Sequence, residues 1–390
     1  MHPKRFVILT ALVTAVETCG PGAMIASATI SIPTVLVGDP GNFPLTTIIC
    51  DGGCGSVSYL YNIGTYEITA GQYTAFLNAV ASESDPNNLY NVNMSNVSYG
   101  SGISRILIPP PGMFRYVVDA RFVNRPVNYV SFWDACRFAN WLHNGQPVGL
   151  QSAVTTEDGA YTLTTAGISN NTVTRNAGWR WAVTSEDEWF KAAYYQPANM
   201  GGDYDNYWLY PTRSNSAPGR SLSDPLGNNA NYWDDSVAGD PGPIQSPYYT
   251  TIVGEFQYSH SFYGTFDQGG NVFEWTEKTF GFYTEYRGGA FNTRATGLES
   301  SDGFGVYYPD WEAKEIGFRI VASLGCQNAD LNGNGSVTVA DLFEFLDVWF
   351  GQFGQSGSGL AADFDGSGSV AVSDLFGYLD TWFEYFGTTC

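Results

Sequence analysis

The sequence is short of basic residues and of long apolar runs, and both shortages limit what the protein can do. Lys and Arg together number 17 against 38 Asp and Glu, which gives a formal net charge of −21. A chain this acidic repels phosphate backbones and anionic membrane surfaces, so nucleic acid is not an expected partner. Beyond the first 28 residues, no run approaches the ~18 apolar residues that a membrane span needs.

Motifs for common catalytic chemistry are also missing. The chain has three His, and it has no HExxH element, phosphate-binding loop, Ser-His-Asp triad or paired-carboxylate signature. What it does have is 44% hydrophobic residues, 16% aromatic residues and 45 Gly. This composition predicts a loop-rich globular protein that is held together by aromatic packing, without long regular helices.

Residues 1–28 are typical of a signal peptide. Lys4 and Arg5 precede the apolar run 6–16, and the segment ends in the small residues 26–28. We therefore expect a secreted or cell-surface protein; the alternative is a buried N-terminal strand. The residues before Cys19 are a poor lipidation context, so no lipid anchor is expected.

The remaining cysteines suggest two disulfides in an oxidising compartment. Cys50 and Cys54 flank a Gly-rich turn, and Cys326 and Cys390 bracket the C-terminal segment. Removal of Cys19 with the signal peptide leaves an odd count, which sets Cys136 apart from these four.

Two helix starts are marked by capping boxes. Ser131 is followed three residues later by Asp134, and Ser185 by Glu188. Cys136 lies on the first of these helices at helical spacing from apolar neighbours, so we expect a buried core thiol and not a nucleophile. The other elements expected in this part of the chain are strands within 30–37 and 57–66 and a helix over 69–80.

The composition changes near Leu324. Residues 326–390 contain nine acidic residues and no Lys or Arg, and they repeat themselves after 33 positions. Each repeat offers oxygen ligands at positions 1, 3, 5, 7 and 12 of an EF-hand-like loop, with Gly at position 6. Calcium is therefore the expected cofactor; the alternative is a pair of Asx-type turns without metal. The predicted ligands are Asp330, Asn332, Asn334, Ser336 and Asp341 in the first loop, and Asp363, Asp365, Ser367, Ser369 and Asp374 in the second.

Each loop ends in Asp and continues as Leu-Phe-x-x-Leu, within the predicted helices 342–350 and 375–383. This arrangement over residues 326–390 resembles the dockerin repeat of secreted bacterial proteins. The resemblance implies a small all-α module that requires calcium to fold and docks a cohesin-like or cell-surface partner through its helix faces. Of the four residues at partner-reading positions, 339, 340, 372 and 373, one carries the usual hydroxyl. Two aromatic pairs, 349–350 and 382–383, would form either an interface or the core, and the core is preferred in so small a domain.

Six ordered segments of residues 31–323 resemble the formylglycine-generating enzyme family, also called the sulfatase-modifying factor family. The resemblance implies a C-type-lectin-like α+β fold with little regular secondary structure. The segments are 66–73, 125–135, 185–193, 270–275, 287–291 and 316–319.

The family's enzymes use copper(I) held by two cysteines, and soft thiolates suit this ion. The resemblance places these positions on Thr293 and Leu298, so neither copper nor formylglycine-generating oxidase activity is expected. The iron-binding His element of the related sulfoxide synthases is absent as well.

The family resemblance also implies a calcium site at Glu274, with Asn271 nearby; the alternative is a hydrogen-bonded core glutamate. Asn231 resembles a ligand of a second family site whose partner motif is missing. Arg287 and Arg319 are expected to tie loops together through carboxylates and carbonyls.

These observations predict a non-catalytic binding or surface-assembly protein that takes a saccharide or peptide ligand and carries a calcium-dependent docking module. Two alternatives remain: a divergent enzyme on the same scaffold, and an accessory protein of extracellular polysaccharide breakdown.

Overall fold

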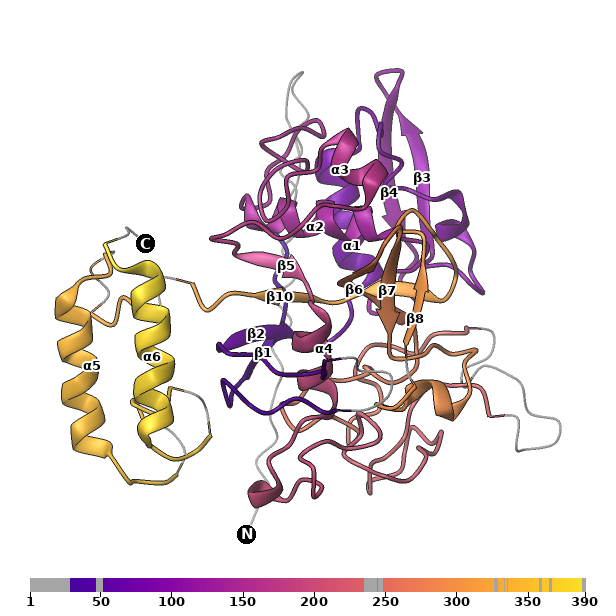
Figure 1. Ribbon diagram of the computed structural model, residues 1–390. Coiled ribbons are helices and arrows are strands. Elements are labelled where there is room, and N and C mark those ends of the chain that lie inside the picture. The colour runs from indigo at the N-terminus through magenta and orange to yellow at the C-terminus, as the bar shows by residue number, and fades with distance from the viewer. Residues whose placement is uncertain are drawn as a thin grey trace, which may run out of the picture.

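The computed structural model describes residues 29–46, 52–234, 244, 248–302, 304–325, 329–332, 334, 336–357, 360–364 and 367–387. It is a mixed α and β structure in which short elements are joined by long loops, and a separate helix pair ends the chain (Figure 1). The longest helices have 14 residues, as the composition predicted. The elements are β1 (Thr34–Val37), β2 (Tyr61–Gly64), α1 (Ala70–Val80), η1 (Val92–Ser95), β3 (Ile103–Ile108), β4 (Met113–Val118), α2 (Phe132–His143), α3 (Thr165–Asn170), β5 (Trp181–Val183), α4 (Glu186–Tyr194), η2 (Ala198–Met200), β6 (Phe273–Phe280), β7 (Tyr283–Arg287), η3 (Ala295–Leu298), β8 (Phe304–Tyr307), β9 (Ile316–Phe318), β10 (Ile320–Ala322), α5 (Val339–Gln352) and α6 (Val372–Tyr385).

Two four-stranded sheets organise the large domain. The first has the order β1-β2-β10-β5, so a strand from the end of the domain lies between strands from its beginning and middle. Its antiparallel register pairs Val321 with Ile63 on one side and with Ala182 on the other. The second sheet has the order β8-β7-β6-β9, with β6 and β9 parallel. Because β9 and β10 are separated only by Arg319, this residue links the two sheets.

The helix starts predicted from capping boxes are confirmed. The Ser131 hydroxyl accepts a hydrogen bond from the Asp134 amide, and Ser185 accepts one from Glu188 in the same way. The helix predicted over 69–80 is α1, which Thr69 caps. Aromatic rings of α1, α2 and β9 meet edge to face, as in the pairs Phe76–Phe138 and Phe138–Phe318 with centroids 5.3 and 5.4 Å apart.

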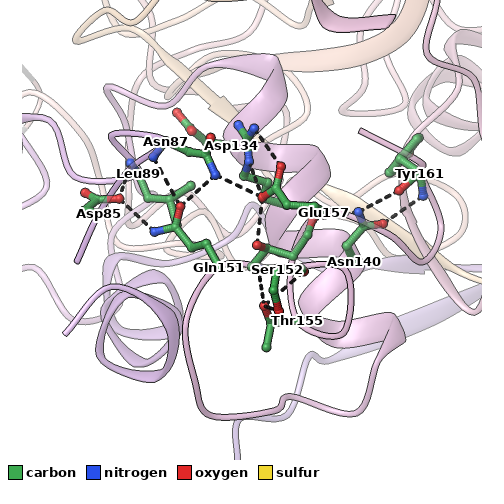
Figure 2. Close-up of polar contacts among 12 residues, drawn as sticks. Asp85, Asn87, Leu89, Asp134, Asn140, Gln151, Ser152, Thr155, Glu157 and Tyr161 are labelled. Atoms are coloured by element: carbon green, nitrogen blue, oxygen red, sulfur yellow. Dashed lines mark hydrogen bonds and ion pairs between the residues drawn. The ribbon is translucent and has the colours of Figure 1, made fainter. Parts of the chain in front are cut away.

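Side-chain hydrogen bonds hold the long loops, as expected for such polar segments. In one such network, Arg137 of α2 binds both carboxylate oxygens of Glu157 at 2.8 and 3.0 Å. Asn87 donates to the same carboxylate, and Gln151 connects Asn87 to Asp85 (Figure 2). Two loops without regular structure are thereby fixed to one helix.

The C-terminal helices α5 and α6 form a pair that obeys the 33-residue repeat. The indole N–H of Trp349 donates to the Ala371 carbonyl at 2.7 Å, and that of Trp382 donates to the Thr338 carbonyl at 2.8 Å. Each tryptophan therefore binds the residue that precedes the opposite helix. The helices are longer than predicted, because Asp341 and Asp374 lie inside their first turns.

Of the four aromatic residues at 349–350 and 382–383, only two have the predicted core role. Trp349 and Trp382 are buried, whereas Phe350 and Phe383 are 72% and 69% exposed. The core prediction is therefore wrong for the two phenylalanines. The reason is helical geometry, since consecutive residues on a helix face directions about 100° apart and only one of each pair can point inward.

Candidate functional site

The two positions at which the family resemblance places the copper ligands, Thr293 and Leu298, lie after β7. The Thr293 hydroxyl accepts a hydrogen bond from the Ala290 amide at 3.0 Å, and the Thr293 carbonyl accepts one from the Trp233 amide at 2.8 Å. Leu298 is fully buried in a small apolar cluster with Tyr210. Both side chains therefore act in packing and in a turn.

Copper(I) does not fit this arrangement. A threonine hydroxyl and a leucine side chain supply no thiolate, and copper(I) selects soft sulfur ligands. Cys136 lies on α2 inside the main hydrophobic core, where burial raises the pKa of its thiol. The prediction that it is a buried core thiol is confirmed.

Glu274 on β6 is tied to the residue that joins β9 and β10. Arg319 Nη2 and Nε lie 2.9 and 3.0 Å from the two carboxylate oxygens of Glu274, and the Trp189 indole N–H donates to the same group at 2.7 Å. All three side chains are fully buried. These contacts match a hydrogen-bonded core glutamate, and calcium at this position stays a prediction.

Asn271 fixes the turn that precedes β6. It adopts a left-handed conformation with φ of 60°, and its side-chain oxygen accepts a hydrogen bond from the Thr251 amide at 2.9 Å. Its amide group donates to Glu67 at 3.0 Å. Burial, followed by the neighbouring charge of Asp267, raises the pKa of the Glu67 carboxyl. The Asn271 side chain thus organises a buried polar cluster.

Both arginines predicted to be structural have that role. Arg319 also donates to the carbonyls of Gly64 and Phe266, each at 2.7 Å. Arg287 binds the carboxylates of Glu186 and Glu285 inside the fold. Loops from distant parts of the sequence are therefore joined through two buried guanidinium groups.

The first predicted calcium loop gathers oxygen atoms before α5. The Asn334 amide donates to Asp330 at 3.0 Å, and the Asn332 amide donates to Asp341 at 3.2 Å, so both carboxylates turn toward the loop. Asp330 and Asp341 are buried, and Asp341 also accepts hydrogen bonds from the backbone amide and the hydroxyl of Thr338. Hard oxygen donors of this kind fit calcium.

The second loop repeats part of this arrangement. Asp363 accepts a hydrogen bond from the Gly368 amide at 2.9 Å, and Asp374 accepts one from the Ala371 amide at 2.7 Å. The Ser369 carbonyl accepts a hydrogen bond from the Ser367 hydroxyl. In the described ranges, His, Cys, Asp and Glu form no group of three or more that could hold a metal ion.

Several predicted features lie outside the described residues. These are the signal peptide 1–28 and Cys50, Cys326, Cys390 and Asp365. Cys54 is described and buried, with its Sγ 3.3 Å from Glu186 Oε1. The two disulfides stay predictions. None of the helices in the described part of the chain is long and apolar enough to cross a membrane.

Two cavities were missed by sequence reasoning. One, of about 630 Å³, lies between the large domain and α6 and includes Trp179 and Asp380 in its wall. The other, of about 640 Å³, follows the extended segment 30–33 and is mostly apolar. The first brings together Trp179 and Asp380, which are 201 positions apart in the sequence. The one sequence signal near it is Gly377, which stands where the first tail repeat has Glu344.

The large domain is an α+β domain built around two sheets whose buried arginines join its loops. It matches the family model described as "Sulfatase-modifying factor enzyme 1-like domain" over residues 34–324, and the chain belongs to this family. This confirms the family predicted for the large domain.

Solved structures with detectable similarity share little sequence with the chain. "Crystal Structure of CarF" is 17% identical and covers 76% of this chain and 99% of its own, with a TM-score of 0.43. "Treponema denticola variable protein 1" is 15% identical and covers 76% and 97%, with a TM-score of 0.42. PvdO from Pseudomonas aeruginosa is 17% identical and covers 79% and 100%, with a TM-score of 0.37. A comparison with curated protein sequences gave no match.

Proposed function

We propose that this protein is a secreted, non-catalytic member of the sulfatase-modifying factor family that binds a ligand through its large domain and a partner through its C-terminal module. The observation that carries the proposal is the packing of Thr293 and Leu298. Their side chains supply no copper ligand and are used in a turn and in an apolar cluster. A fold without its reactive groups does not dictate a reaction.

The C-terminal module is proposed to be a dockerin-like domain that needs calcium. Three observations support this: the duplicated loops, the reciprocal contacts of Trp349 and Trp382, and the carboxylates of Asp330 and Asp341 turned toward one loop. Calcium would be held by these carboxylates together with neighbouring amide and carbonyl oxygens, which are the hard ligands that this ion prefers.

The helix faces of this module carry exposed apolar side chains in symmetric pairs. Val339 and Val372 occupy equivalent positions of α5 and α6, and so do Phe350 and Phe383. Exposed aromatic side chains in such a stripe are typical of a protein interface. A cohesin-like or cell-surface protein is therefore the proposed partner. The remaining pairs in the stripe are Phe343 with Phe376 and Phe353 with Phe386.

The first test is metal analysis of the purified mature protein, combined with calcium and copper(I) titrations followed by thermal unfolding. Calcium bound to the native state raises its apparent stability by mass action, so the unfolding temperature should rise with calcium concentration. The double variant Asp330→Ala, Asp363→Ala should lose this rise. Asp310→Ala, an exposed acid in the large domain, serves as the control and should keep it.

Stoichiometric calcium without copper is the expected result. Tight copper(I) binding would overturn the non-catalytic assignment and reopen oxidase chemistry. A calcium response that is equal in the wild type and the double variant would overturn the assignment of the tail loops.

A further inference from the structure

The cavity between the large domain and α6 has walls from both parts of the chain. Trp179, Glu277 and Leu324 belong to the large domain, and Asp380 and Thr381 belong to α6. Figure 1 shows α6 lying between α5 and the strands of the first sheet. At about 630 Å³ the cavity falls within the 300–1,000 Å³ range of ordinary ligand pockets.

The repeat sequence departs from its symmetry where α6 meets the large domain. Gly377 lies so close to Leu60 that an added Cβ would be 3.0 Å from its Cδ1. The equivalent residue of α5, 33 positions earlier, is the exposed Glu344. Glycine in the middle of a helix is unfavourable by about 1 kcal/mol relative to alanine. Close approach of α6 to Leu60, together with the nearby ring of Phe364, gives a reason for accepting this cost, so the repeat is adapted to contact with the large domain at this position.

Charge limits the class of ligand. Arg175 is held between two carboxylates, binding both oxygens of Glu188 at 2.8 Å and Glu277 at 2.9 Å. One guanidinium therefore faces two acids, and the exposed carboxylate of Asp380 adds a third acid in the wall that α6 contributes. An anionic ligand would be repelled.

Neutral polar groups and one indole complete the wall. The hydroxyls of Ser185 and Thr381 and the amide of Asn176 belong to residues that line the cavity. The half-buried Trp179 packs against the main core, and Arg175 lies 4.3 Å from its ring centroid. Among the residues that the structure describes, none accepts a hydrogen bond from the Trp179 indole N–H.

We propose that this inter-module cavity binds a neutral saccharide. A pyranose ring has an apolar C–H face that packs on an indole, and its hydroxyls donate to carboxylates and exchange hydrogen bonds with hydroxyls and amides. The packing surface is the part of the Trp179 ring that Arg175 and the core leave exposed. Glu277 and Asp380 accept hydrogen bonds from the sugar, and the Trp179 N–H donates one to it. The inference rests on the proposed binding function and names its ligand class and its site.

The test is isothermal titration calorimetry on the full mature chain in calcium. The probes are cellobiose, maltose, lactose and N,N′-diacetylchitobiose, with digalacturonate and trilysine as charged comparators. At least one neutral disaccharide should bind when present at about 10 mM, which would reveal even a millimolar dissociation constant. Digalacturonate should bind more weakly.

Variants separate the cavity from the rest of the surface. Trp179→Ala should weaken binding about tenfold or more, and Trp179→Phe should restore part of it. Asp380→Asn should weaken binding severalfold. The matched control is Asp347→Asn, because Asp347 is the exposed equivalent of Asp380 in α5 and does not line the cavity. It should bind as the wild type does.

Any one of three results would overturn the inference. They are that no neutral disaccharide binds, that neither Trp179→Ala nor Asp380→Asn weakens binding, and that trilysine binds and the neutral disaccharides do not. Calcium-dependent thermal stability of the same preparation reports on the proposed function separately. If calcium stabilises the protein but no sugar binds, only the cavity assignment fails. If calcium has no effect, the calcium-dependent docking module of the proposed function fails, whether or not a sugar binds.

Discussion

Phe345 and Tyr378 stack face to face with ring centroids 4.0 Å apart and planes 5° from parallel. The two residues are equivalent positions of the repeat, so they meet where the two halves of the C-terminal module are related by approximate two-fold symmetry. Reciprocal backbone bonds from Gly354 to Val370 and from Gly387 to Val337, both 2.8 Å, follow the same symmetry. Each half therefore completes the core of the other, and neither is expected to fold alone.

The stacked pair should be essential for the module. Phe345→Ala removes a fully buried ring and should cost about 3–5 kcal/mol, which is comparable to the whole stability of so small a domain. We expect the unfolding transition of the C-terminal module to disappear in calorimetry while the transition of the large domain stays. Phe350→Ala, which truncates an exposed ring of the same helix, is the control and should keep both transitions.

The ion pair between Glu274 and Arg319 should dominate the response of the large domain to loss of charge. Arg319→Met leaves a carboxylate buried without its cation, and breaking a buried pair in this way costs about 3–5 kcal/mol. Urea unfolding measures the change. Arg121→Met, which breaks an exposed pair with Asp119, should leave the midpoint unchanged. Equal effects of the two variants would show that Glu274 is not held by Arg319 in solution.

Stability should fall with rising pH through the ionisation of Asp134. Burial, followed by the nearby charge of Glu312, raises the pKa of Asp134 from its ordinary 3.8 to about 8. The folded state then binds the proton more tightly than the unfolded state. The stabilising contribution is therefore complete below about pH 4 and is lost as the pH rises to 8.

Comparison of the wild type with Asp134→Asn isolates this effect, because Asn keeps the neutral form at every pH. Between pH 4 and pH 8, the wild type should lose unfolding free energy relative to Asp134→Asn. Asp119→Asn is the control: Arg121 lowers the pKa of Asp119 to about 2, so its difference from the wild type should stay flat in that window. A flat profile for Asp134→Asn would contradict the prediction.

Cys136 should resist thiol reagents until the domain unfolds. Its side chain is fully buried in α2, and burial raises the pKa of the thiol, so little reactive thiolate forms. Labelling with a chromogenic disulfide reagent should follow the urea unfolding curve. Fast labelling of the native protein that is absent in Cys136→Ala would show that the hydrophobic core does not cover this thiol.

Local sequence signals predicted the parts of the fold that depend on neighbours in the chain. Capping residues such as Ser131 and Ser185 placed helix starts, because the hydrogen bonds involved span three residues. The 33-residue repeat indicated the paired tail helices, and the ordered motifs indicated the family, which the family match confirms. Strand ends were less accurate: β1 and β2 cover only parts of the predicted 30–37 and 57–66.

Only the tertiary structure decided which distant groups meet. Residue identity alone determined that Thr293 and Leu298, where the family resemblance places the copper ligands, carry no thiol. It did not determine that Arg319 holds Glu274, that Phe350 is exposed beside the buried Trp349, or that Trp179 and Asp380 share a cavity. Those relationships depend on how sheets and helices pack across long sequence separations. Local hydrogen bonds are compatible with many such packings, and the close packing of side chains stabilises one of them.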